Sequence, residues 1–340
     1  MCVQKIILSS VILALFFANN ACRRPKETAA LDTITVYAFS VMKEPLEKDI
    51  FPAFQKEWAA HTGQQVKFSA SFAGSEMVTN QIISGVPADV AIVAIERNAR
   101  RLRAFGATKT DWHSFPYEGI INQSPIVIVT RKGNPRKIKD FPDLTQPGLK
   151  LLHPDPTSSG GAQWSLLAIY CSELVKSEKE TGKRDEQKAY DLLRGVWKNV
   201  FAWPESSRQA RTQFESGFGD ALITYELEAL QMKDRKMPVE IIIPRATIFT
   251  DHTVVMIDRR MPQAKRELVD AFIKFLWSEE AQKAFVKNHF RGITDELMNE
   301  VEAKFGKVEL PFTVEDFGGW QNAYPQIIEN VWKYKVQAMR

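Results

Sequence analysis

Apolar residues mark three short stretches near the start of the chain, with the spacing typical of β-strands. The predicted strands are "TITVYAFS" (33–40), "QVKFSASF" (65–72) and "ADVAIVA" (88–94). Between the first two, apolar side chains recur every four residues over 44–63, which predicts an amphipathic helix closed by Gly63. This alternation of strands and helices indicates an α/β fold.

The same alternation continues through the rest of the chain. Further strands are expected at 124–135, 149–156, 239–244 and 252–258, and 220–230 predicts a strand that passes into a helix. Helices are expected at 165–175, 189–200 and 208–217, with two more within 263–289. The charged stretch 176–188 between the first two helices is expected to form a solvated surface turn.

Turn-forming residues divide this pattern into two α/β halves. One half is expected to combine 31–122 with 253–340, and the other to cover 127–243. The chain would cross between them near 123–126 and again near 244–252. Ligands of α/β proteins bind beyond the carboxyl ends of strands and in clefts between domains, so the boundary between the halves is the expected site.

The stretch "PDPTSSGGAQW" (154–164) places four small residues, Ser158 to Gly161, at the start of an apolar helix. They can form an ordinary capped turn after two prolines. They can also let backbone N–H groups approach a bound anion, which the helix dipole favours. Three other segments likewise follow a strand and precede a helix. They are 39–43, 73–76 and 205–208. Helix starts that converge on one cleft would form a pocket rich in hydrogen-bond donors.

The N-terminus predicts export. Lys5 precedes the apolar run 6–18, and small residues lead to Cys22, as in a signal peptide over 1–21. The position of Cys22 directly after Ala21 favours a lipoprotein whose cysteine is acylated. A transmembrane anchor is the alternative, but the apolar run is short for a membrane span.

Composition limits the other possibilities. The chain has 340 residues, 44% of them hydrophobic, which is enough for two cores. Its net charge of +4 is small and its charges are interspersed, so nucleic-acid binding receives little support. Cys171 is the only cysteine after Cys22, so no disulfide can form within the fold. No His/Cys/Asp cluster shows metal-ligand spacing, and no cofactor is expected.

Several motifs, in order along nearly the whole mature chain, resemble the sulfate/thiosulfate-binding proteins of ATP-driven sulfate uptake. They are "SFAGSEMVTNQIISGVPADVAIVA" (71–94), "VIVTRKGNPRKIKDFPDL" (127–144), "TSSGGAQW" (157–164), "GFGDALITYELEAL" (217–230) and "DFGGW" (316–320). The resemblance implies a two-lobed periplasmic binding protein of type II, with the ligand in the cleft between lobes. It also implies a monomer that hands its anion to an ABC-transporter permease.

The same resemblance implies the ligand-binding residues. Backbone N–H groups would come from Val41, Ser75, Gly160, Gly161 and Ser207, and hydroxyls from Ser75 and Ser159. Tyr225 stands where the family uses a tryptophan indole. Ala73 and the Ser206-Ser207 pair also depart from the family's glycine-rich pattern.

A pocket made only of donors suits sulfate, which is fully deprotonated at neutral pH and only accepts hydrogen bonds. Hydrogen phosphate would leave its proton without an acceptor, at a cost of about 1–3 kcal/mol. A phenol such as Tyr225 can donate like an indole but can also accept, which would admit a partly protonated oxyanion.

Other functions stay open at this point. The site could serve phosphate or molybdate, or the chain could be a sensory lipoprotein that has lost its ligand. A hydrolase would need one of the serines at 75 or 158–159 beside a histidine, of which His153 is the best placed, but Ser75 lacks a G-x-S-x-G elbow. Arg208 and Arg211 are expected to pair at the surface with Glu205 or Glu215.

Overall fold

The computed structural model describes residues 32–294, 297 and 304–339, so the predicted signal peptide and Cys22 lie outside it. The strands are β1 Asp32–Phe39, β2 Val66–Ala73, β3 Val90–Val93, β4 Ile120–Arg131, β5 Leu151–Leu152, β6 Val200–Ala202, β7 Ala221–Tyr225, β8 Val239–Ile242, β9 Ala246–Met256 and β10 Leu310–Phe312. The α-helices are α1 Lys43–Pro45, α2 Phe51–Thr62, α3 Ser75–Ile83, α4 Glu96–Ala104, α5 Gly160–Thr181, α6 Glu186–Lys198, α7 Ser207–Glu215, α8 Glu226–Asp234, α9 Gln263–Phe275, α10 Glu279–Lys287 and α12 Gly319–Ala323.

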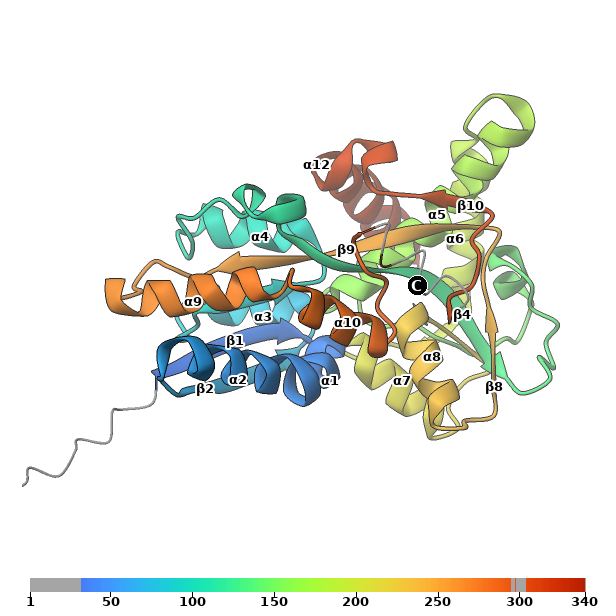
Figure 1. Cartoon of the computed structure of the whole chain (residues 1–340). Coiled ribbons are helices and arrows are strands. Elements are labelled where there is room, and N and C mark those ends of the chain that lie inside the picture. Colours follow the sequence, from blue (N-terminus) through green and yellow to red (C-terminus); the bar gives the residue numbers. More distant parts are fainter. Residues whose placement is uncertain (1–31, 295–296, 298–303, 340) are drawn as a thin grey trace, which may run out of the picture. The chain divides into compact units, whose positions relative to one another are not determined.

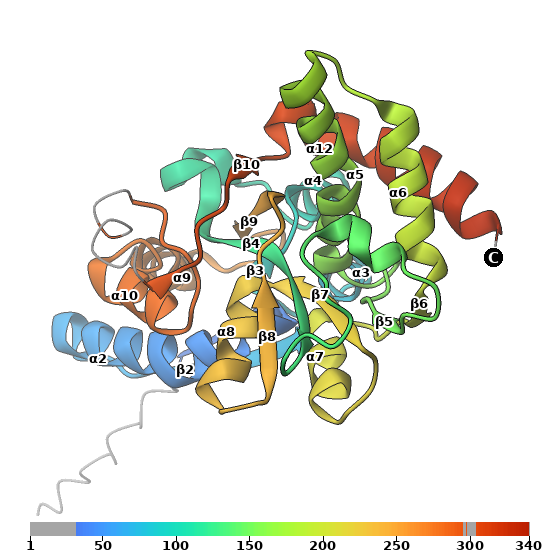
Figure 2. The same cartoon turned by 90° about the vertical axis from the view of Figure 1, so that its right-hand side faces the viewer.

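The strands are joined in the order β2-β1-β3-β9-β4-β7-β5-β6, with β10 beside β9 and β8 beside β4 (Figure 1 and Figure 2). Strands β1, β2 and β3 pair in parallel, and helices connect them, as the sequence predicts. Strand β9 runs antiparallel to β3, and β4 runs antiparallel to β7. The α/β class expected from the sequence is confirmed.

Two long strands link the two ends of this order. Strand β4 pairs with β9 as far as Pro125 and with β7 from Ile126 onward. Strand β9 pairs with β3 from Thr253 onward. Below, residues 32–119 are called the N-terminal region and residues 132–243 the central region. Both predicted crossings fall on β4 and β9 or directly before β9, while the exact lobe boundaries stay a prediction.

Most predicted elements are present, and the exceptions have physical reasons. The helix over 44–63 is confirmed, since α2 ends at Thr62 and Gly63 follows with φ of 70°. The strand expected at 149–156 is only two residues long, because Pro154 and Pro156 cannot donate to a ladder. The expected surface turn at 176–188 is wrong in its first part. Helix α5 continues to Thr181, and Lys176 is buried against Asp140 at 3.1 Å.

The N-terminal region is held by an apolar core on both faces of its sheet. All four residues of β3 are completely buried. On one face, Phe51 of α2 stacks on Phe68 of β2, with ring centroids 4.0 Å apart. Phe272 of α9 packs against the same Phe68 ring at 4.8 Å. These aromatic contacts fix α2 and α9 on this face of the sheet.

The last helical segment packs against the central region. The helical segment that follows α12 lies against α5 and α6 (Figure 2). Trp332 meets Trp197 of α6 edge-on at 5.3 Å, and Trp320 meets Trp164 of α5 at 4.5 Å. The part of the stretch 253–340 that holds Trp320 and Trp332 therefore packs against α5 and α6. Within the part of the chain that the structure describes, no helix combines the length and apolar character needed to cross a membrane.

Candidate functional site

Three helices of the structure begin at the serine and glycine motifs that the sequence singles out. Ser75 is the first residue of α3, Gly160 and Gly161 are the first two of α5, and Ser207 is the first of α7. Ser159 caps α5, with its Oγ accepting from the N–H of Ala162 at 3.3 Å. The sequence forms caps here because serine offers the oxygen that the first turn lacks.

The starts of α3 and α5 touch each other although they belong to different regions. A methyl group on Gly160 would lie 2.9 Å from Cβ of Ala94 and 3.1 Å from Cβ of Ser75. Gly74, which precedes Ser75, lies directly against the carbonyl oxygen of Ser158. Only glycine fits at these two contacts, and this explains the small residues of both motifs.

The starts of α5 and α7 meet at the end of β7. A methyl group on Gly161 would clash with Oγ of Ser207 and would lie 2.9 Å from the phenol oxygen of Tyr225. Tyr225 is the last residue of β7 and is only 1% exposed. Gly161, Ser207 and Tyr225 therefore form one corner of the candidate site.

Val41 reaches the same place from the end of β1. It is the second residue of a 3₁₀ turn, Ser40–Met42, and is completely buried. Before it, the ring of Phe39 lies 6.4 Å from that of Tyr225, and after it Glu44 forms an ion pair with Arg208 of α7. The structure thus brings all seven predicted ligand-binding residues together.

The converging helix starts leave several backbone donors unpaired. The first N–H groups of any helix have no partner within it. Among the described residues, no carbonyl or side chain accepts from the leading amides of these three helices. These amides belong to Ser75, Gly160, Gly161 and Ser207. An anion at this point would be met by donors and by the positive ends of helix dipoles.

The hydroxyl of Ser75 is engaged within its own region. It donates to Oδ1 of Asn98 at 2.9 Å and accepts from the N–H of Ala94 at 3.0 Å. Asn98 lies on α4 and is completely buried. Sequence reasoning missed Asn98, because nothing in the motif of α3 points to a residue 23 positions further along.

Glu76 is a second residue that sequence reasoning missed. Its backbone N–H donates to the carbonyl oxygen of Ser158 at 3.1 Å, which ties α3 to the loop before α5. Its carboxylate accepts from Arg97 at 2.9 Å, from Asn98 at 3.0 Å and from Gln163 of α5 at 3.2 Å. A buried carboxylate next to an anion site would repel the anion, and these donors offset its charge.

The arginines near the site are paired with carboxylates. Arg208 pairs with Glu44 and with Glu228, and Nε of Arg211 lies 3.1 Å from Glu228. Burial opposes the charge of Arg208, but Glu228 and Glu44 together raise its pKa. The expected pairing of Arg211 with Glu215 is present at 3.4 Å, but its surface location is wrong, because the arginine side chain is only 2% exposed. The partners expected for Arg208 are wrong, since it pairs with Glu44 and Glu228 instead. The candidate site therefore offers an anion amides and hydroxyls rather than an unpaired cation.

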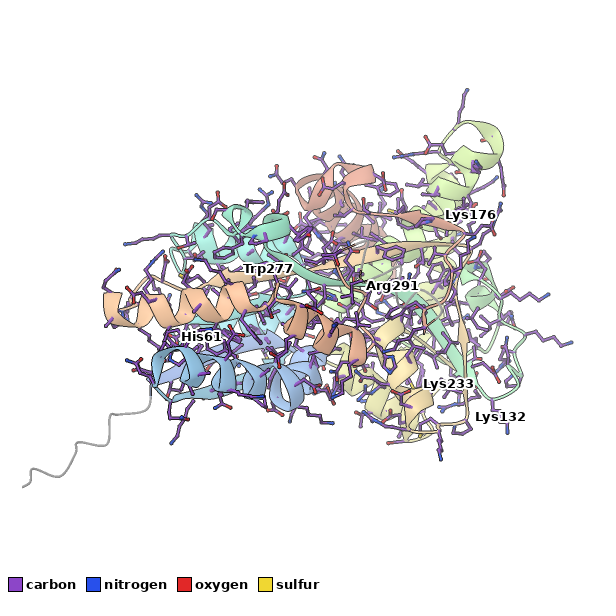
Figure 3. All side chains as sticks on the ribbon, viewed as in Figure 1. His61, Lys132, Lys176, Lys233, Trp277 and Arg291 are labelled. Atoms are coloured by element: carbon purple, nitrogen blue, oxygen red, sulfur yellow. The ribbon has the colours of Figure 1, made fainter. Side chains whose placement is uncertain are left out.

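The histidines do not form a nucleophile–base pair with Ser75, whose hydroxyl contacts Asn98. His61 lies exposed on α2 (Figure 3). Burial lowers the pKa of His153 to about 4, and its Nδ1 faces the carbonyl oxygen of Pro154 at 2.6 Å. Within the described ranges, no group of three or more His, Cys, Asp or Glu could hold a metal ion.

The chain is similar to proteins of one bacterial family. The family model for the bacterial extracellular solute-binding proteins matches residues 34–291. The sulfate-binding protein of Synechococcus elongatus is 33% identical over 308 residues, which is 89% of this chain and 86% of that protein. The thiosulfate-binding protein of Pseudomonas aeruginosa is 30% identical over 297 residues, which is 84% of this chain and 86% of that protein.

A solved structure supports the fold independently. The sulfate-binding protein of Mycobacterium tuberculosis superposes with a TM-score of 0.78 at 29% identity, covering 87% of this chain and 99% of that one. The periplasmic-binding-protein fold expected from the sequence is confirmed by this match.

Proposed function

Because the chain belongs to the bacterial extracellular solute-binding proteins, and within them to the sulfate- and thiosulfate-binding proteins, we propose that it captures sulfate for uptake. Solute-binding proteins act outside the cytoplasm and are not enzymes. Thiosulfate is the alternative ligand, since it shares the tetrahedral form and the lack of a proton at neutral pH.

The observation that carries this proposal is the convergence of unpaired backbone donors from the starts of α3, α5 and α7. A fully deprotonated tetrahedral anion accepts hydrogen bonds on every oxygen, and each contact with it is charge-assisted. The arginines nearby are neutralised by Glu44 and Glu228, so selectivity would come from matching donors to oxygens. We assign ligand contacts to Val41, Ser75, Ser159, Gly160, Gly161, Ser207 and Tyr225.

We propose that the anion is held between two lobes that close by bending at β4 and β9. The lobes would be 31–122 with 253–340 and 127–243, joined near 123–126 and 244–252. The supporting observation is that β9 pairs with β3 of the N-terminal region, β4 pairs with β7 of the central region, and β4 and β9 pair with each other. Continuous strands can twist without losing their ladder, which suits a hinge.

The partner proposed for the loaded protein is a membrane permease driven by a cytoplasmic ATPase. We also propose that the mature chain is a monomer anchored by a lipid on Cys22. The support for the anchor is the signal-like pattern that ends at Ala21.

Isothermal titration of the mature protein with sulfate, thiosulfate, molybdate and phosphate tests the proposed ligand. The expected result is saturable binding of sulfate or thiosulfate at one site per chain. Saturable binding of molybdate, with sulfate and thiosulfate inert, would replace the proposed ligand. Absence of binding to all four would refute the function.

A further inference from the structure

The phenol of Tyr225 is a buried polar group without a partner. The residue is 1% exposed, and within the described part of the chain its hydroxyl has no hydrogen-bond partner. The hydroxyl lies beside Gly161 at the start of the 22-residue helix α5. Leaving such a group unpaired is costly, so its position at a cluster of unpaired amides points to a ligand contact.

The other donors of the site are more restricted. Backbone amides can only donate. The hydroxyl of Ser75 already donates to Asn98 and accepts from Ala94. The hydroxyl oxygen of Ser159 already accepts a hydrogen bond from the N–H of Ala162. The corner formed by Tyr225 and Ser207 is therefore the place where a ligand can find acceptors as well as donors.

The phenol also stays neutral. Burial, reinforced by the negative charge of Glu228, raises the pKa of Tyr225 far above its ordinary value. Glu228 is itself completely buried. A neutral hydroxyl can turn its proton toward the ligand or away from it, and it does not repel an anion.

We propose that Tyr225 makes this site accept monoprotonated tetrahedral oxyanions, of the hydrogen phosphate class, in addition to fully deprotonated ones. This inference rests on the proposed function, since it concerns the same site. A protonated oxygen of the ligand would donate to the phenol oxygen, with Ser207 as the neighbouring hydroxyl. A site of donors alone would disfavour such an anion roughly ten- to hundredfold.

Paired titrations with sulfate and with inorganic phosphate test the inference at neutral pH. In the unmodified protein we expect phosphate to bind within about tenfold of sulfate. Tyr225→Trp supplies a donor without an acceptor, so the affinity ratio should move at least about tenfold toward sulfate. Tyr225→Phe removes the acceptor without adding bulk and should move the ratio in the same direction.

The ratio of the sulfate and phosphate affinities separates a role of Tyr225 in ligand selection from a structural role, because partial unfolding weakens the binding of both anions equally. Tyr170→Phe is the matched control. Tyr170 is buried like Tyr225, but it lies on α5, away from the start of that helix. An unchanged ratio in both Tyr225 variants would overturn the inference while leaving sulfate binding intact. Absence of binding to either anion in the unmodified protein would instead refute the proposed function.

Discussion

The two sides of the candidate site treat their hydroxyl groups differently. At the start of α3, the hydroxyl of Ser75 is held by Asn98 and Ala94 inside the N-terminal region. At the corner of the central region, the buried hydroxyl of Tyr225 lies beside Ser207 and has no hydrogen-bond partner among the described residues. One side thus offers fixed backbone donors, and the other offers groups whose protons can reorient. In the proposed site, an anion would be met by a rigid half and an adaptable half.

The largest expected effect comes from Gly160, where the two sides touch. Gly160→Asp would force a side chain against Ala94 and Ser75 and would add a negative charge at the site. We expect sulfate affinity to fall at least about a hundredfold, as titration would measure. Gly148→Asp is the control, because a side chain there meets no atom within 4 Å and aspartate is among the residues that tolerate the positive φ of 73° at this position. Retained affinity in the Gly160 variant would show that the anion binds elsewhere.

Removing one hydroxyl at a time, at Ser75 and at Ser207, tests the difference between the two sides. Ser75→Ala leaves Oδ1 of Asn98 and the N–H of Ala94 without this partner, so the free energy of unfolding should fall by about 1–3 kcal/mol. Ser207→Ala should change stability by less than about 0.5 kcal/mol but weaken sulfate binding about tenfold. Thermal melts and titration measure the two quantities. Equal losses of sulfate affinity in both variants would contradict the proposed difference between the two sides.

The pH dependence of the free energy of unfolding tests the packing around Tyr225, through the buried ring of His252. His252 of β9 packs edge-on against Tyr225 at 5.4 Å, and burial lowers its pKa from 6.5 to about 3. Below pH 6.5 the unfolded chain therefore binds more protons than the folded one. The stabilisation is complete above pH 6.5 and is lost as the pH falls toward about 3.

His252→Gln should remove this part of the pH dependence. Between neutral pH and about pH 5, the variant should lose about 1–2 kcal/mol less than the unmodified protein, as denaturant unfolding at each pH would show. His153→Gln is a useful comparison, because His153 is equally buried but lies in the central region. A curve for His252→Gln that parallels the unmodified protein would contradict the assignment.

The smallest expected effect concerns the ion pair between the regions. Glu44→Gln removes the negative charge that pairs with Arg208, which keeps its pairing with Glu228. Partly exposed pairs contribute about 0.5–1 kcal/mol, so sulfate affinity should fall two- to fivefold, roughly, and the loss should shrink at high salt. Glu279→Gln, which breaks a pair within α10, should leave affinity unchanged. A tenfold loss in both variants would point to an indirect effect.

Most of the fold could be predicted because its elements have strong local signals. The four-residue spacing that predicts α2 and the apolar run that predicts β3 are properties of single segments. Strand β5 is shorter than predicted because the apolar pattern does not register that Pro154 and Pro156 lack the N–H that a ladder needs. The end of α5 was misjudged because charge alone does not stop a helix, and Lys176 finds a buried partner in Asp140.

The backbone donors of the candidate site could also be predicted, since each lies where a small-residue motif meets a helix. Asn98 and Glu76 could not, because their roles depend on packing between α3, α4 and α5. The same holds for Arg211, whose burial follows from its contact with Glu228, a residue of another helix. Sequence motifs reveal groups that the backbone places, while side-chain networks become visible only when helices are docked.

The ladder of β4 and β9 has a consequence for how the molecule can be dissected. Where the chain passes between the regions, from Gln123 to Pro125, it is paired with Phe249 to Asp251. Endoproteases need an extended, accessible loop, and this crossing offers them a hydrogen-bonded strand instead. Limited digestion should therefore not release the two regions as separate fragments. To produce either region on its own, both β4 and β9 would have to be redesigned.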